Sequence, residues 1–174
     1  MIRFKEEIEF KNKCFRSIKY ENWLVRLLKN RKIYDSFTSF SYNYYSGGTK
    51  FWQQHGDIII EFDLDKVLEQ GGIETEYTPE FFEKYPDIAE YVLNYENKYE
   101  YAEEAGIEKD NEDEINDSWE TLIESLKDEQ EILVETQFKY EPGLILKVNF
   151  HNGKKPSPEL KKLLNKYKIK YEIK

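Results

Sequence analysis

Two glutamates, Glu129 and Glu131, stand two residues apart at the head of an apolar run, Ile132-Leu133-Val134. On a β-strand, side chains alternate between faces, so both carboxylates would point to one side and Gln130 to the other. Two carboxylates beside a dry core can stabilise a positively charged sugar in a transition state and position an acceptor group. Other Glu-x-Glu triplets occur in this acidic chain, so the pair by itself does not indicate a function. The residues that precede it in the sequence distinguish it from the other triplets.

Two earlier segments place polar side chains inside apolar strand patterns. Arg16 lies within Phe15-Arg16-Ser17, and Ser39 and Ser41 lie within Phe37-Thr38-Ser39-Phe40-Ser41. The planar fork of an arginine binds an oxyanion with two donors, and serine hydroxyls can hold a ligand or a neighbouring strand by hydrogen bonds. Each residue alone also has a structural interpretation: an edge-strand cation, polar positions of a half-buried strand, and a solvated strand end for the glutamates.

The residues between these motifs predict an α+β fold with short strands and amphipathic helices. Asp63 and Ser157 are predicted to cap helices, and the last strands are predicted to be antiparallel. The interval 79–126 is predicted to be helical and acidic, with a charged, exposed interruption at 110–117. Strands are predicted at 13–18, 34–41, 57–63, 73–77, 131–135, 144–150 and 168–173, and further helices at 20–29, from 63 to the Gly71-Gly72 pair, and from 158.

Composition restricts the class of protein. The chain has 174 residues, 39% of them hydrophobic and 16% aromatic, which predicts one domain with a real core. The net charge of −9 argues against nucleic-acid or anionic-membrane binding and is compatible with a basic protein partner. The single Cys14 excludes an internal disulfide, and no Cys/His cluster predicts a metal site. No signal-peptide pattern and no membrane-spanning run are seen, so we expect a cytoplasmic protein.

Taken in order, three motifs resemble the arginine–serine–glutamate class of mono-ADP-ribosyltransferases, which includes binary-toxin enzymatic components, vertebrate ecto-transferases and accessory transferases of T-even phages. That family reads aromatic-Arg-Gly in its first strand, Phe-x-Ser-Thr-Ser in its second, and Glu-x-Glu followed by aliphatic residues in its third. Here Ser17 replaces the glycine, and Phe40 replaces the middle threonine. The matching segments are Phe15-Arg16-Ser17, Phe37-Thr38-Ser39-Phe40-Ser41 and Glu129-Gln130-Glu131-Ile132-Leu133.

The resemblance implies a single domain over residues 1–174 with the split, antiparallel or mixed sheet of the ADP-ribosyltransferase type, flanking helices and an acidic helical insert at about 79–126. It implies that ADP-ribose is transferred from NAD, which is a substrate, to a protein side chain. A glutamate at position 129 suits a guanidinium acceptor, as in the arginine-modifying subclass. The role implied is that of a toxin-like or phage-type effector.

The resemblance also assigns roles to residues. Glu131 would stabilise the oxocarbenium-like transition state through the ribose 2′-hydroxyl, and Glu129 would orient or deprotonate the acceptor. Arg16 would bind the NAD diphosphate. Ser39 would hold the first strand and the ribose, with Thr38 as the hydroxyl in an alternative register.

Ser41 and an aromatic wall for nicotinamide complete the expected NAD site. The wall is expected from the cluster after the second strand, where Tyr44 and Trp52 are candidates beside Tyr42, Tyr45 and Phe51.

Two other functions fit the sequence. The first is a non-catalytic acidic inhibitor or adaptor that binds a basic protein, indicated by the negative charge and the helical insert. The second is an NAD-cleaving enzyme without a protein acceptor, in which Glu131 is essential and Glu129 is dispensable.

Overall fold

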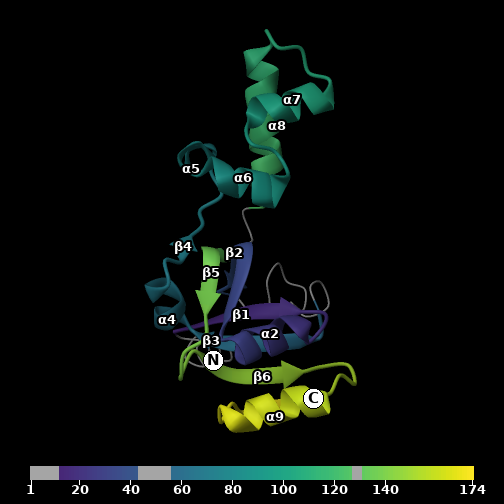
Figure 1. Cartoon of the computed structure of the whole chain (residues 1–174). Helices are drawn as coiled ribbons and strands as arrows, with labels where there is room; N and C mark the ends of the chain where they lie inside the picture. The colour runs from purple at the N-terminus through teal and green to yellow at the C-terminus, as the bar shows by residue number, and fades with distance from the viewer. Residues whose placement is uncertain (1–11, 43–55, 127–130) are drawn as a thin grey trace, which may run out of the picture. The chain divides into compact units, whose positions relative to one another are not determined.

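The computed structural model describes residues 12–42, 56–126 and 131–174, and the chain divides into two compact units (Figure 1). We call Met1–Glu74 together with Glu131–Lys174 the sheet unit, and Thr75–Gln130 the helical unit. The acidic insert predicted at about 79–126 falls inside the helical unit. Each unit is described separately below.

The sheet unit is built on one seven-stranded sheet in the order β4-β5-β2-β1-β3-β6-β7. All neighbouring strands are antiparallel except β6 and β7, so the predicted α+β class with a mostly antiparallel sheet is confirmed. The strands are β1 (Lys13–Ile18), β2 (Lys32–Ser41), β3 (Ile58–Asp63), β4 (Ile73–Glu74), β5 (Glu131–Lys139), β6 (Ile145–Phe150) and β7 (Tyr171–Ile173), and the helices are α2 (Asn22–Asn30), α4 (Leu64–Glu69) and α9 (Pro158–Lys166).

The parallel pairing of β6 with β7 corrects the prediction that the last strands are antiparallel. The two strands are joined by α9, and a crossover helix returns the chain to the same end of the sheet, so that the second strand runs parallel to the first. β5 and β6 follow one another across the turn at Glu141-Pro142-Gly143, yet they pair with different strands, β5 with β2 and β6 with β3.

The sheet splits between β1 and β2. All six residues of β1 pair with β3, and β2 pairs with β5 from Lys32 to Ser41 with one irregularity. In contrast, β1 and β2 share a single register pair, Phe15 with Ser41. Beyond that pair the two strands diverge, so the split opens between the strand that carries Arg16 and the strand that carries Ser39.

Two helices cover the core of the sheet unit. The helical spacing predicted at 20–29 is confirmed in α2, which buries Trp23, Leu24, Leu27 and Leu28, and α9 buries Leu160 and Leu164 against the same core. Both predicted caps are confirmed: the Asp63 side chain accepts from the Lys66 amide, and the Ser157 side chain accepts from the Leu160 amide. Aromatic rings fill the centre of this core: Trp23, Phe40, Phe62 and Phe138.

The helical unit contains α5 (Pro79–Lys84), α6 (Pro86–Leu93), α7 (Lys98–Ala105) and α8 (Glu112–Glu124). The interruption predicted at 110–117 is wrong, because most of that interval lies inside α8. Three of its acidic residues, Glu112, Asp113 and Glu114, occupy the first turn of α8, where the helix dipole favours negative charge, and Ile115 on the next turn is buried.

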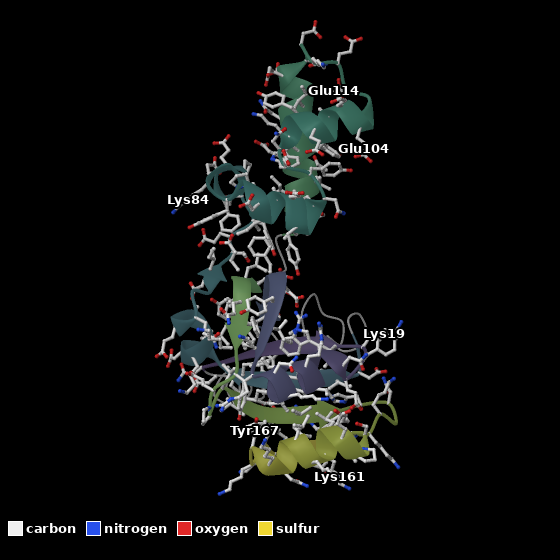
Figure 2. The ribbon with its side chains drawn as sticks, in the orientation of Figure 1. Lys19, Lys84, Glu104, Glu114, Lys161 and Tyr167 are labelled. Atoms are coloured by element: carbon white, nitrogen blue, oxygen red, sulfur yellow. The ribbon has the colours of Figure 1, made fainter. Side chains whose placement is uncertain are left out.

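Charge is divided unequally between the units. The helical unit carries 19 acidic and 4 basic residues, a formal net charge of −15. The sheet unit carries 16 acidic and 22 basic residues, a formal net charge of +6. Figure 2 labels Glu104 and Glu114, two of the exposed carboxylates of the helical unit. In the described part of the chain, no helix combines the length and the apolar character that crossing a membrane requires.

Candidate functional site

Three adjacent strands carry the candidate residues. Ser41 of β2 pairs with Phe15 of β1 on one side and with Glu131 of β5 on the other. Phe15, Ser41 and Glu131 therefore form one row across the sheet. The three motifs, which are far apart in the sequence, meet at the point where β1 and β2 are still paired.

Arg16 spans the beginning of the split. Its Nη1 donates to the Ser39 carbonyl at 3.1 Å and lies 3.5 Å from the Ser39 hydroxyl oxygen. Its guanidinium carbon lies 4.6 Å from the centroid of the Trp23 ring, which is a cation–π contact. Because β1 and β2 diverge here, a side chain reaches a backbone carbonyl of the opposite strand. These contacts hold the guanidinium in one orientation.

Strand alternation assigns the side chains to faces of the sheet. Phe40 and Ile132 belong to the core, so their neighbours Ser41 and Glu131 point to the opposite face. Arg16 lies two residues from each of the core residues Cys14 and Ile18, so it points to the same face as they do, the side of α2.

The structure thus brings Arg16 to Ser39 and Ser41 to Glu131. The Arg16 and Glu131 side chains therefore lie on opposite faces of the sheet.

The contact with Arg16 favours Ser39 over Thr38 as the hydroxyl of the second motif. Thr38 is 1% exposed, and by strand alternation it lies on the core side beside Phe40. Ser39 is half-buried and lies within reach of the guanidinium. The contact with Arg16 therefore supports the register in which Ser39 is the first serine of Phe-x-Ser-x-Ser.

Several predicted site residues lie outside the described residues. These are Glu129, the candidate for acceptor activation, and the nicotinamide-wall candidates Tyr44, Tyr45, Phe51 and Trp52.

Tyr42 is the one member of that aromatic cluster within the described ranges. It is half-buried and packs against the core of the sheet unit. Burial, together with a hydrogen bond to the Glu74 carboxylate, raises the pKa of Tyr42 well above its usual range. The hydrogen bond of Tyr42 to Glu74 links the end of β2 to β4.

A buried polar network that was not predicted from the sequence lies beside the row. Glu61 of β3, opposite Phe15, is 6% exposed and accepts from the Asn149 side chain at 2.8 Å and from Lys13 Nζ at 3.2 Å. The available signal was a charged residue inside the apolar strand Ile58–Asp63. A buried carboxylate with two donors is satisfied; removing Lys13 would leave its charge uncompensated, and removing Asn149 would remove a hydrogen bond. The network fixes β1, β3 and β6 next to the split.

Within the ranges 12–42, 56–126 and 131–174, no group of three or more His, Cys, Asp or Glu side chains is placed to hold a metal ion. Comparisons of the chain with protein-family models, with curated proteins and with solved structures each found no match.

Proposed function

We propose that the chain transfers ADP-ribose from NAD to a protein side chain, with arginine as the acceptor. The observation that carries the proposal is the contact of Arg16 with Ser39 across the split, one residue from the row that joins Ser41 to Glu131. A split, mostly antiparallel sheet is also what the resemblance to mono-ADP-ribosyltransferases implies. The net charge of +6 on the sheet unit supports binding of the anionic NAD diphosphate.

The proposed reaction breaks the bond between nicotinamide and ribose. The bonding electrons leave with nicotinamide, and positive charge develops on the ribose ring. The Glu131 carboxylate stabilises that charge through the ribose 2′-hydroxyl, as carboxylates do in glycoside hydrolysis. Arg16, oriented by Ser39 and Trp23, binds the diphosphate. A guanidinium nitrogen of the acceptor forms the new bond to ribose C1′, and Glu129 takes the proton that it loses.

Transfer of labelled ADP-ribose from NAD tests the proposal. The full chain is incubated with labelled NAD and with agmatine, a small guanidinium acceptor, or a basic protein. Glu131→Gln keeps the size of the side chain and removes its charge, and we expect transfer to fall by roughly 100-fold or more. The matched control is Glu135→Gln, an exposed glutamate on the same strand, for which transfer should be unchanged.

Two results would contradict the proposal: a wild-type chain that neither transfers label nor releases nicotinamide, or equal transfer by wild type and Glu131→Gln. Nicotinamide release without transfer to any acceptor would instead assign NAD hydrolysis.

The charge of the helical unit favours a second candidate function, an acidic adaptor or inhibitor that binds a basic protein. A net charge of −15 on Thr75–Gln130 would attract such a partner at long range. This candidate predicts salt-sensitive association with a basic protein and no binding of NAD. Binding of NAD by calorimetry together with a Glu131-dependent reaction would exclude the purely non-catalytic form.

A further inference from the structure

The helical unit contains a cavity of about 480 Å³. Its walls come from α5 and α6, from the start of α7 and from α8. All lining residues belong to the helical unit, so the cavity is complete within it. This volume lies within the range of protein sites that hold a small ligand or one large side chain.

Two aromatic side chains form the apolar part of the lining. Phe82 of α5 and Trp119 of α8 both line the cavity and are 3% and 4% exposed. Their ring centroids lie 6.2 Å apart in an edge-to-face arrangement, and Tyr101 packs on Trp119 at 5.9 Å. These contacts hold the two rings in fixed orientations, and the small exposed part of the indole that lines the cavity can contact a bound cation.

Four exposed carboxylates also line the cavity, and we call them the rim: Glu83, Asp87, Glu96 and Glu120. None of them forms a salt bridge with another described residue. Lys98 is the single cation in the lining, and its Nζ donates to the Asn116 side chain at 2.9 Å. The lining therefore has three more negative than positive charges, which favours a cationic occupant.

We infer that this cavity binds the side chain of an arginine from a partner protein. A guanidinium is planar and weakly hydrated, so it stacks on an aromatic ring more readily than an ammonium does. Its edge donates paired hydrogen bonds to carboxylates, which the rim supplies. An anionic occupant would be repelled by the rim, and a purely apolar one would make no use of its charge.

This inference is separate from the proposed transfer reaction. Its test requires neither NAD nor Glu131. A negative result for arginine binding therefore does not contradict the transfer reaction, and a negative result for the transfer reaction does not contradict arginine binding.

The first experiment measures binding of two short Gly/Ser peptides to the full chain. One peptide has a central arginine flanked by lysines, and the other has citrulline in place of the arginine, which keeps the shape and removes the charge. We expect the arginine peptide to bind at least tenfold more tightly and to shift the indole NMR signal of Trp119. Equal binding of the two peptides, or binding that leaves the Trp119 signal unmoved, would overturn the inference.

The second experiment compares two variants with the same change in net charge. The rim variant neutralises the four carboxylates: Glu83→Gln, Asp87→Asn, Glu96→Gln and Glu120→Gln. The control variant neutralises four exposed carboxylates of the helical unit that do not line the cavity: Glu90→Gln, Glu108→Gln, Asp110→Asn and Asp113→Asn.

The rim variant should lose at least tenfold in affinity for the arginine peptide, and the control variant less than twofold. Circular dichroism verifies that both remain folded. Equal losses would show general charge attraction rather than a site, and no loss in the rim variant would also contradict the inference. The peptide comparison on the unmodified chain stands even if a variant fails to fold.

Discussion

The sheet unit and the helical unit differ in how their candidate sites arise. In the sheet unit, pairing of β1, β2 and β5 brings Arg16 to Ser39 and places Ser41 beside Glu131, although these residues come from distant parts of the chain. In the helical unit, the cavity forms from short helices that follow one another. Their charges also differ in sign, +6 and −15. We propose that the basic unit holds an anionic cosubstrate and that the acidic unit binds a basic protein.

The largest expected effect is a loss of stability that is confined to one of the two units. Phe138 is fully buried in the aromatic centre of the sheet unit, against Trp23, Phe40 and Phe62. Phe138→Ala should lower the free energy of unfolding of this unit by about 3–5 kcal/mol, because it removes a large apolar side chain and leaves a cavity. Hydrogen exchange should show faster exchange of strand amides while α8 amides keep their protection.

The control for that prediction is Tyr34→Ala, which truncates an exposed aromatic residue of β2. This variant should leave the hydrogen-exchange rates of the strand amides nearly unchanged. If Phe138→Ala accelerated exchange in α8 as much as in the strands, the two units would unfold as one, and the comparison would fail.

The next effect concerns NAD binding by the sheet unit. Arg16→Lys keeps the positive charge and removes the planar fork, so the affinity for NAD should fall roughly 10–100-fold by calorimetry. Arg26→Lys is the matched control, since Arg26 is exposed on α2. Unchanged NAD affinity in Arg16→Lys would show that Arg16 only stabilises the split.

Cys14 provides a titration probe of the sheet unit alone, because it is the only cysteine in the chain. Burial, with a smaller contribution from Asp63, raises the pKa of the Cys14 thiol to about 12. The folded state keeps the proton that the unfolded state loses near pH 9, so this stabilisation is present below pH 9 and is lost as pH rises to about 12.

We expect the free energy of unfolding to fall between these pH values by at most about 1.4 kcal/mol per pH unit from this group. The measurement is the free energy of unfolding of wild type and of Cys14→Ala, obtained by denaturant titration at several pH values over that pH range. Parallel pH profiles for the two proteins would contradict the buried, protonated thiol.

The smallest effects come from the helix caps, one in each unit. Ser157 caps α9 and its amide donates to Glu21 at 3.0 Å, whereas the Asn111 side chain accepts from the Glu114 amide at the start of α8. Ser157→Ala and Asn111→Ala should each cost about 1 kcal/mol. Hydrogen exchange should show that Ser157→Ala destabilises the sheet unit and that Asn111→Ala destabilises the helical unit. A loss that appeared in both units for either variant would again indicate one cooperative unit.

Local features of the fold were predictable from the sequence. The apolar run Ile58–Phe62 marked β3, the spacing of Trp23, Leu24, Leu27 and Leu28 marked α2, and the polar residues Asp63 and Ser157 marked helix starts. Each of these patterns involves only a few neighbouring residues, so it can be recognised without knowledge of the tertiary structure.

Features that depend on distant partners were not predictable in the same way. The parallel pairing of β6 with β7 and the split between β1 and β2 are set by which strands meet. The high charge of 110–117 suggested a break, although a helix N-terminus tolerates this charge and Ile115 anchors it.

For the site, the sequence proposed Arg16 and Ser39, which the structure brings into contact. It gave no hint that Glu61 would be held by Lys13 and Asn149, because those partners lie on other strands.

The central claim is that the sheet unit holds an NAD-cleaving site that depends on Glu131. The most direct measurement is the rate of nicotinamide release from NAD by the full chain and by its Glu131→Gln variant, with NAD binding of both followed by calorimetry. The account predicts release by the wild type, a rate lower by roughly 100-fold or more in the variant, and nearly unchanged binding. A wild-type chain that binds no NAD and releases no nicotinamide, or equal rates for the two proteins, would contradict it.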